Sequence, residues 1–285
     1  MAKKDKDEVI IRHLDQHITT FTTKFNRFAP FGYRNFIAVG NRATAICLSS
    51  GKILLLNPIH LTPSIKNALN DLGGLHYVAC DLGHHMYIRS YLDTWPQAKS
   101  IGVKGQDFKR PDVRWDYIYD PSDLNSEKPE VTFAFSDEIE TIMFSGFITR
   151  AIAWHHKPSH TLILSDQLMN LPCVEQYAPL SSAGQGPGSW AFSQVAHPNS
   201  LFFRSLIYFI ATTDYGAMRV DAKRVAEWDV QRIVVCHGEV IEEGGSEAWR
   251  SAYRWFLEGR ARPGLVRRGW DTWMKGMRRV GLGAW

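Results

Sequence analysis

Short apolar segments alternate with amphipathic segments along this chain, and this order constrains its fold more than any other feature. TAICLSS (44–50), KILLLN (52–57) and HYVAC (76–80) have the length and apolar character of buried strands. Residues 62–74 carry a helix signal, with a threonine that can cap, a proline at the first helical position and two glycines at the end. This alternation predicts a layered α/β domain.

The same order continues to about residue 259. We expect a helix from about His84 to Trp95, ended by Pro96. Residues 179–200 have the composition of a loop that could cover a site, and a helix over 246–259 closes the pattern. Further strands are predicted at 36–39, 100–103, 117–119, 131–135, 140–144, 150–154, 161–165 and 232–236.

The size of the chain fits one large domain. It has 285 residues, 45% of them hydrophobic, so it can bury one large core, and a mostly disordered chain is excluded. With no internal repeat and no boundary before about residue 260, we predict a polar segment over 1–30, a domain over 31–259 and a basic, tryptophan-bearing tail over 260–285. We see no signal peptide and no membrane span, and the four cysteines form no CxxC pair, so we expect a cytoplasmic protein with reduced thiols.

The positive charge lies mainly in the tail. The net charge is +4, but the tail alone has seven basic residues against the single acid Asp271, so the rest of the chain is slightly negative. A nucleic-acid-binding domain would carry basic residues across a whole face, so we expect no nucleic-acid partner. The tail itself is interpreted as a solvated terminal helix whose arginine stems cover apolar surface.

Histidines and one aspartate lie at the ends of several predicted strands. His84 and His85 follow one strand, His155 and His156 end another, and Asp166 and His237 each follow a further one. In layered α/β folds, the loops after strands form the ligand crevice. Neutral imidazoles together with a carboxylate suit zinc, iron or manganese. The combined placement predicts a metal site.

Each of these residues taken alone also fits a purely structural role. The His84–His85 pair could start a helix, Asp166 could cap the segment after its strand, and His237 with Gly238 could be an ordinary strand-to-turn junction. Their equivalent positions at strand ends favour the metal site over three separate structural roles.

The sequence also resembles a known family. The segments LLLNPIHLTP, ALNDLGGLHYVACDLGHHMYI, WPQAKSIGV, HHKPSHTLILSDQLMN and VVCHGEVIEEGG are similar to those of a DUF4336-type family related to metallo-β-lactamases, over roughly residues 30–258. The resemblance implies a four-layer αββα metallo-β-lactamase-type sandwich, with its site along the edge where the two sheets meet.

The resemblance assigns roles position by position. The superfamily's HxHxDH loop corresponds here to CDLGHH, so that His85 matches the final histidine and His84 stands where aspartate is usual. The first two histidines of that loop are missing. Asp166 matches the bridging carboxylate and His237 the terminal histidine. His156 resembles the remaining metal histidine, with His155 and His160 as alternatives.

The missing histidines imply one metal in place of two. The retained donors (His84, His85, Asp166, His237) suit one divalent ion, expected to be zinc, with iron and manganese as alternatives. We expect His84 and Asp166 to take part in catalysis and His156 to complete the ligand set. The implied function is a metal-dependent hydrolase, or lyase, of a small ester, lactone, thioester or amide. The alternative is a degenerate member that kept the fold as a binding or structural protein without catalysis.

Overall fold

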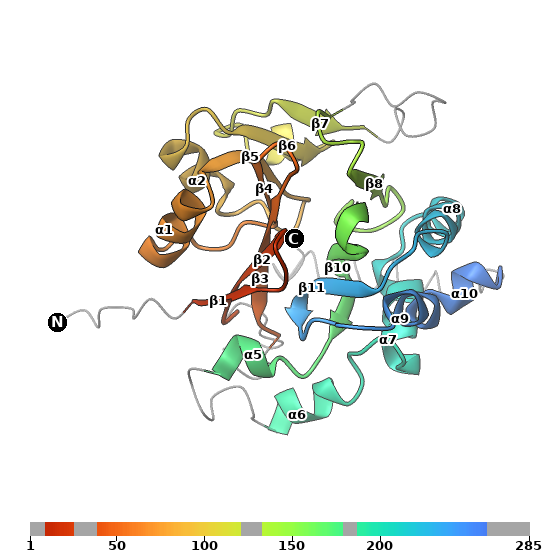
Figure 1. Ribbon diagram of the computed structural model, residues 1–285. Helices are drawn as coiled ribbons and strands as arrows, with labels where there is room; N and C mark the ends of the chain where they lie inside the picture. The colour runs from red at the N-terminus through yellow and green to blue at the C-terminus, as the bar shows by residue number, and fades with distance from the viewer. Residues whose placement is uncertain (1–8, 26–38, 121–132, 179–186, 261–285) are drawn as a thin grey trace.

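Two β-sheets form the centre of the protein, in a computed structural model that describes residues 9–25, 39–120, 133–178 and 187–260 (Figure 1). The first sheet has seven strands in sequence order: β1 (Ile10–His13), β2 (Ile18–Thr23), β3 (Asn41–Cys47), β4 (Ile53–Leu56), β5 (Leu75–Ala79), β6 (Lys99–Val103) and β7 (Tyr117–Tyr119). The second has four strands in the order β11 (Arg232–Gly238), β10 (Thr161–Asn170), β9 (Ile152–His156) and β8 (Ile139–Met143).

Successive side chains of a strand point alternately into the core between the two sheets and into the core on the outer face of its own sheet. In β10, Ile163 packs into the core between the sheets, while Leu162 and Leu164 point to the opposite face. In β4, Leu54 and Leu56 likewise point inward, and Leu55 points outward. Strands that are apolar on both faces are typical of sheets covered on both sides.

Helices cover the two outer faces and complete four layers. The helices α1 (Pro63–Asp71) and α2 (Ile88–Thr94) pack on the seven-stranded sheet, and α8 (Tyr215–Ala226), α9 (Gly245–Ala252) and α10 (Arg254–Leu257) pack on the four-stranded sheet (Figure 1). The predicted αββα sandwich is therefore confirmed. The remaining helical segments are short: α3 (Gln106–Lys109), η2 (Lys157–Ser159), α5 (Val174–Tyr177), α6 (Pro187–Ser193), α7 (Leu201–Ser205) and the π-helix η4 (Leu206–Ala211).

Several predicted boundaries differ from the structure. Residues 10–23, assigned from the sequence to the polar segment before the domain, form β1 and β2, and β2 pairs with β3. The helix expected from His84 begins only at Ile88, because Asp81 holds residues 83 and 84 in a turn. The strand expected at 131–135 is not formed by its described residues, since 134 and 135 lie in a turn, and the helix expected over 246–259 is two helices, α9 and α10.

Some expectations concern residues outside the described ranges. They include the strand expected at 36–39 except Val39, the start of the loop at 179–200, and the tail after Arg260. Among the described residues, no helix has both the length and the apolar character needed to span a bilayer.

The parallel pair β10 and β11 positions the site. Because the two strands run in the same direction, their carboxyl ends lie together, with Met169 paired to His237. Their register shifts between Leu164 and Met169, and Asp166 lies in this irregular stretch. The strand β5 is parallel to β4 and β6, and the loop that carries His84 follows its carboxyl end.

Candidate metal centre

Three side chains from separate parts of the chain converge at this edge. His84 comes from the loop after β5, Asp166 from the irregular part of β10, and His237 from the end of β11. Asp166 Oδ1 lies 3.2 Å from His237 Nε2 and 3.9 Å from His84 Nε2. One donor atom of each residue lies within 4.8 Å of the other two.

The orientation of His84 is set by Asp81. The buried Asp81 carboxylate accepts hydrogen bonds from the backbone N–H groups of Gly83 (2.8 Å) and His84 (3.0 Å) through Oδ1. The same oxygen lies 3.0 Å from His84 Nδ1, and the Ser165 hydroxyl donates to the other oxygen, Oδ2. A carboxylate accepts only, so Nδ1 carries the proton that it donates to Asp81, and Nε2 faces Asp166.

The orientation of His237 is set by a backbone carbonyl. His237 Nδ1 lies 2.7 Å from the carbonyl oxygen of Gly40, to which it must donate, so Nε2 again faces Asp166. Gly40 has a φ of +61°, and a Cβ atom there would lie 1.8 Å from Gln176 Oε1. Glycine is therefore required at this carbonyl.

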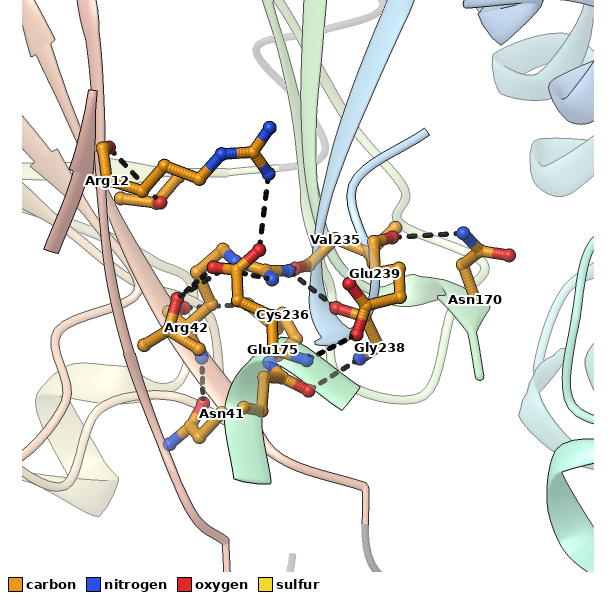
Figure 2. A network of polar contacts seen from close by, with 12 residues as sticks. Arg12, Asn41, Arg42, Asn170, Glu175, Val235, Cys236, Gly238 and Glu239 are labelled. Carbon is orange, nitrogen blue, oxygen red and sulfur yellow. Dashed lines mark hydrogen bonds and ion pairs between the residues drawn. The ribbon is translucent and has the colours of Figure 1, made fainter. Parts of the chain in front are cut away.

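A buried arginine holds the strand end on which His237 lies (Figure 2). Arg42 of β3 has a fully buried side chain, and its Nη1 donates to the carbonyl oxygens of Val235 (2.6 Å) and Gly238 (2.7 Å). Its partner is Glu175, whose Oε1 lies 3.5 Å from Arg42 Nη2. Because β3 belongs to the first sheet and β11 to the second, Arg42 joins the two sheets directly beside the candidate site.

The charges of the cluster favour an ion pair in the metal-free protein. Burial alone lowers the pKa of His84, but the Asp81 and Asp166 carboxylates outweigh it and hold that pKa well above its usual value. Burial raises the pKa of Asp166, whereas the neighbouring His84 and His237 lower it below its usual value. A divalent cation that binds here therefore takes the place of a proton on His84.

The donor set fits one divalent transition metal. Two Nε2 atoms and a carboxylate oxygen are the ligand types of zinc, and a tetrahedral ion bound at about 2.1 Å needs ligand atoms about 3.4 Å apart. Hydrogen bonds from Nδ1 to a carboxylate and to a backbone carbonyl are the outer partners typical of metal-bound histidines. The Asp166 side chain is 22% exposed, so solvent reaches the centre at this carboxylate.

The structure does not bring His85 and His156 into the cluster. Arg110 Nη1 donates to the His85 carbonyl oxygen (2.7 Å) and lies 3.4 Å from His85 Nδ1. His156 ends β9, which runs antiparallel to β10, so it pairs with Thr161, five residues and roughly 16 Å from Asp166 along the strand. The buried His156 contacts Ser159 through Nδ1 (2.7 Å).

The alternatives His155 and His160 also lie away from the cluster. His155 contacts Glu140 (3.0 Å) and the Asp229 carbonyl oxygen (3.1 Å), and His160 lies 3.0 Å from the Asp229 carboxylate. These four placements reduce the sequence-based ligand set to His84, Asp166 and His237 within the described residues.

Sequence reasoning missed the residues that orient the two imidazoles. Asp81 stood in the same strand-to-loop junction as His84, and that position was a readable signal. Arg42 and Gly40 lie 195 and 197 positions before His237. Their contacts depend on how the two sheets meet, so no local pattern indicated them.

The fold matches that of solved structures. A metallo-β-lactamase from Pontibacter korlensis has a TM-score of 0.55 at 8% identity, over 87% of this chain and 99% of that one. A metallo-β-lactamase from Hirschia baltica has a TM-score of 0.53 at 12% identity, over 86% and 96% of the two chains. The Flv1 flavodiiron core from Synechocystis has a TM-score of 0.57 at 15% identity, over 88% of this chain and 61% of that one.

At these identities the likeness shows the fold alone. No family model matches the sequence, and no curated protein matches it. The chain has the metallo-β-lactamase fold.

Proposed function

From this fold, we propose that the chain is a mononuclear metal-dependent hydrolase, with His84, Asp166 and His237 as its metal ligands. The similarity to a DUF4336-type family remains a prediction from the sequence and belongs to the same proposal. The proposal rests on two hydrogen bonds, from His84 Nδ1 to Asp81 and from His237 Nδ1 to the Gly40 carbonyl oxygen. They direct both Nε2 atoms at Asp166 Oδ1. Three protein ligands leave a fourth position for water or substrate, as catalytic zinc sites require.

The ion would supply a Lewis acid that polarises a substrate carbonyl and acidifies a bound water. His84 can offer only Nε2 to the centre, because Asp81 takes the proton on Nδ1. It is therefore assigned as a ligand, and it cannot act as a proton acceptor at the same atom. Asp166 Oδ1 faces the two imidazoles, so its other oxygen, Oδ2, is the group here that can hold the proton of an attacking water.

The reaction class follows from these groups. A Lewis acid beside a carboxylate suits addition of water to a small ester, lactone, thioester or amide. A lyase reaction would use the same metal with a different proton acceptor. The competing hypothesis is a degenerate binding or structural protein, which the absence of the usual HxH pair favours.

A substrate screen separates the two hypotheses. Protein loaded with one equivalent of Zn²⁺ is assayed on p-nitrophenyl acetate, a lactone, a thioester and an anilide, beside the Asp166→Ala variant and a chelator-treated sample. We expect hydrolysis of at least one class, lost in both controls. Zn²⁺-loaded protein that turns over none of the four supports the binding or structural role.

A further inference from the structure

A pocket of about 470 Å³ opens beside the metal centre and carries positive charge. Its walls are the loop after β5, the residues after β6, the turn between β8 and β9, and Thr213. Among the described residues that line it, none is acidic. The lining includes three cations and three apolar side chains: Lys104, Lys109, Arg150, Leu82, Phe147 and Ile148.

Two of the cations are held by backbone carbonyl groups. Lys109 Nζ donates to the carbonyl oxygen of Leu82 (2.8 Å), which uses one of its three protons, and Arg150 Nη1 donates to the carbonyl oxygen of Lys104. A Cβ atom at Gly105 would lie 3.6 Å from Arg150 Nη1. Gly105 therefore lies beside the guanidinium, and its φ of +98° is a backbone conformation that favours glycine. Lys104 is partly neutralised by Asp120, 2.6 Å away.

Arg150 adopts an unusual backbone conformation at this point. Its φ is +50°, in the left-handed region that non-glycine residues occupy at a cost, and its N–H donates to the Phe147 carbonyl oxygen (2.9 Å) to close the turn. Such conformations are enriched at active sites and ligand-binding sites, where the surrounding structure maintains the strain.

The pocket and the candidate metal centre share the loop after β5, which carries both Leu82 and His84. Leu82 lines the pocket, and the next residue, Gly83, is so near the centre that a Cβ there would lie 3.1 Å from Asp166 Oδ2. Thr149, between Ile148 and Arg150, accepts a hydrogen bond from the Leu82 N–H (3.0 Å) and also contacts the Gly83 position. Gly83 therefore connects the Leu82 wall of the pocket with the surroundings of Asp166.

We propose that this pocket binds the oxyanion of a small organic molecule, a phosphate or a carboxylate, with an apolar body against Leu82, Phe147 and Ile148. The guanidinium of Arg150 and the ammonium of Lys109 are the donors for the oxyanion. The volume is in the range of small-molecule sites. The further role of the pocket, as the anchor for a substrate hydrolysed at the metal, rests on the proposed function.

Calorimetry on the full chain, stripped of metal with chelator and dialysed, tests the anion site by itself. The probes are phenyl phosphate, benzoate and the uncharged phenol. We expect at least one anion to bind tenfold or more tightly than phenol, and its affinity to fall as salt is raised. The better of the two anions identifies the oxyanion as phosphate or carboxylate. Because no metal is present, failure of the hydrolase proposal does not affect this result.

The variants Arg150→Gln and Lys109→Met each remove one pocket cation, and Arg89→Gln is the matched control. Arg89 of α2 contacts Asp93 and Asp112 and does not line the pocket. We expect each pocket variant to weaken anion binding three- to tenfold, and Arg89→Gln to change it less than twofold. Thermal melting shows that each variant is folded. Anions that bind no tighter than phenol, or a control that weakens binding as much as both pocket variants, would overturn the proposal.

Discussion

At His84, the direction of one ring nitrogen depends on a carboxylate three residues earlier in the chain. Asp81 accepts from Nδ1 and from two backbone N–H groups, so it fixes both the ring and the turn that carries it. Outer partners of this kind typically contribute 10- to 100-fold to metal affinity. We therefore propose that Asp81 is a positioning residue at the candidate metal centre.

We predict that Asp81→Asn keeps the three ligands but weakens Zn²⁺ binding by about 10- to 100-fold. An asparagine side chain is neutral, so it cannot accept the hydrogen bonds of the turn and of the His84 imidazole as a carboxylate does. Competition with a chromophoric chelator measures the dissociation constant. The control is Asp93→Asn, which removes an exposed carboxylate on α2. Equal affinities for the two variants would contradict the role of Asp81.

A second residue-scale prediction concerns Asp221 of α8. Burial, opposed by Arg224 and the Ser145 backbone, raises the pKa of this carboxyl to about 7, and its Oδ2 finds no hydrogen-bond partner among the described residues. The folded protein therefore holds the proton that the unfolded chain releases near pH 3.8. The retained proton therefore stabilises the folded protein fully below pH 3.8, and this contribution to stability is lost as pH rises to about 7.

We predict that Asp221→Asn becomes more stable than wild type as pH rises from 4 to 7, by a few kcal/mol, with little further change above pH 7. Urea unfolding at pH 4.5 and pH 8 measures the difference, and the exposed Asp107→Asn serves as the control. A stability difference that is the same at both pH values would contradict the raised pKa.

At the scale of the elements, the end of β11 depends on contacts from β3. Arg42 donates to two carbonyl groups on either side of His237, and its ion-pair partner is Glu175, whose side chain is 14% exposed (Figure 2). Glu175 also pairs with Arg12, whose side chain is 42% exposed, at 3.2 Å. The same carboxylate therefore has one buried and one exposed arginine partner.

We predict that Arg42→Met lowers the free energy of unfolding by about 3–5 kcal/mol, because it leaves Glu175 and two carbonyl groups without a buried cation. Arg12→Met removes the exposed partner and is expected to cost about 1 kcal/mol or less. Arg42→Lys keeps the charge, and its loss of unfolding free energy should lie between the losses for Arg42→Met and Arg12→Met. Denaturant unfolding of the three variants measures the order. A loss for Arg12→Met equal to that for Arg42→Met would contradict the account.

The elements also show what local sequence patterns can and cannot predict. The helix α1 was predicted with its cap, and Thr62 Oγ1 accepts from the Ile65 N–H as expected, because a cap lies within four residues of its helix. The strands β1 and β2 were not expected, since IIRH and the threonine-rich ITTFTT have no long apolar run and follow a charged start. β2 is buried and pairs with β3, which is a tertiary contact, and β1 pairs with β2.

At the scale of the whole molecule, the sequence indicated the sandwich and the edge where its donors meet. It placed His237 at the carboxyl end of a strand, where β11 has it, whereas Asp166 was expected after its strand and lies inside β10, which continues to Asn170. It could not separate His84 from His85, since neighbouring residues in a loop differ only in orientation. It could not exclude His156, because the direction of β9 relative to β10 is not written in any local pattern.

The central claim is that His84, Asp166 and His237 hold one divalent metal. Elemental analysis of protein purified without added metal or chelator measures it, for wild type, Asp166→Ala and His85→Ala. We predict one metal per chain in wild type and in His85→Ala, and none in Asp166→Ala. A melting curve shows that each protein is folded. Folded wild type with no metal or with two, or an Asp166→Ala variant that retains its ion, would contradict it.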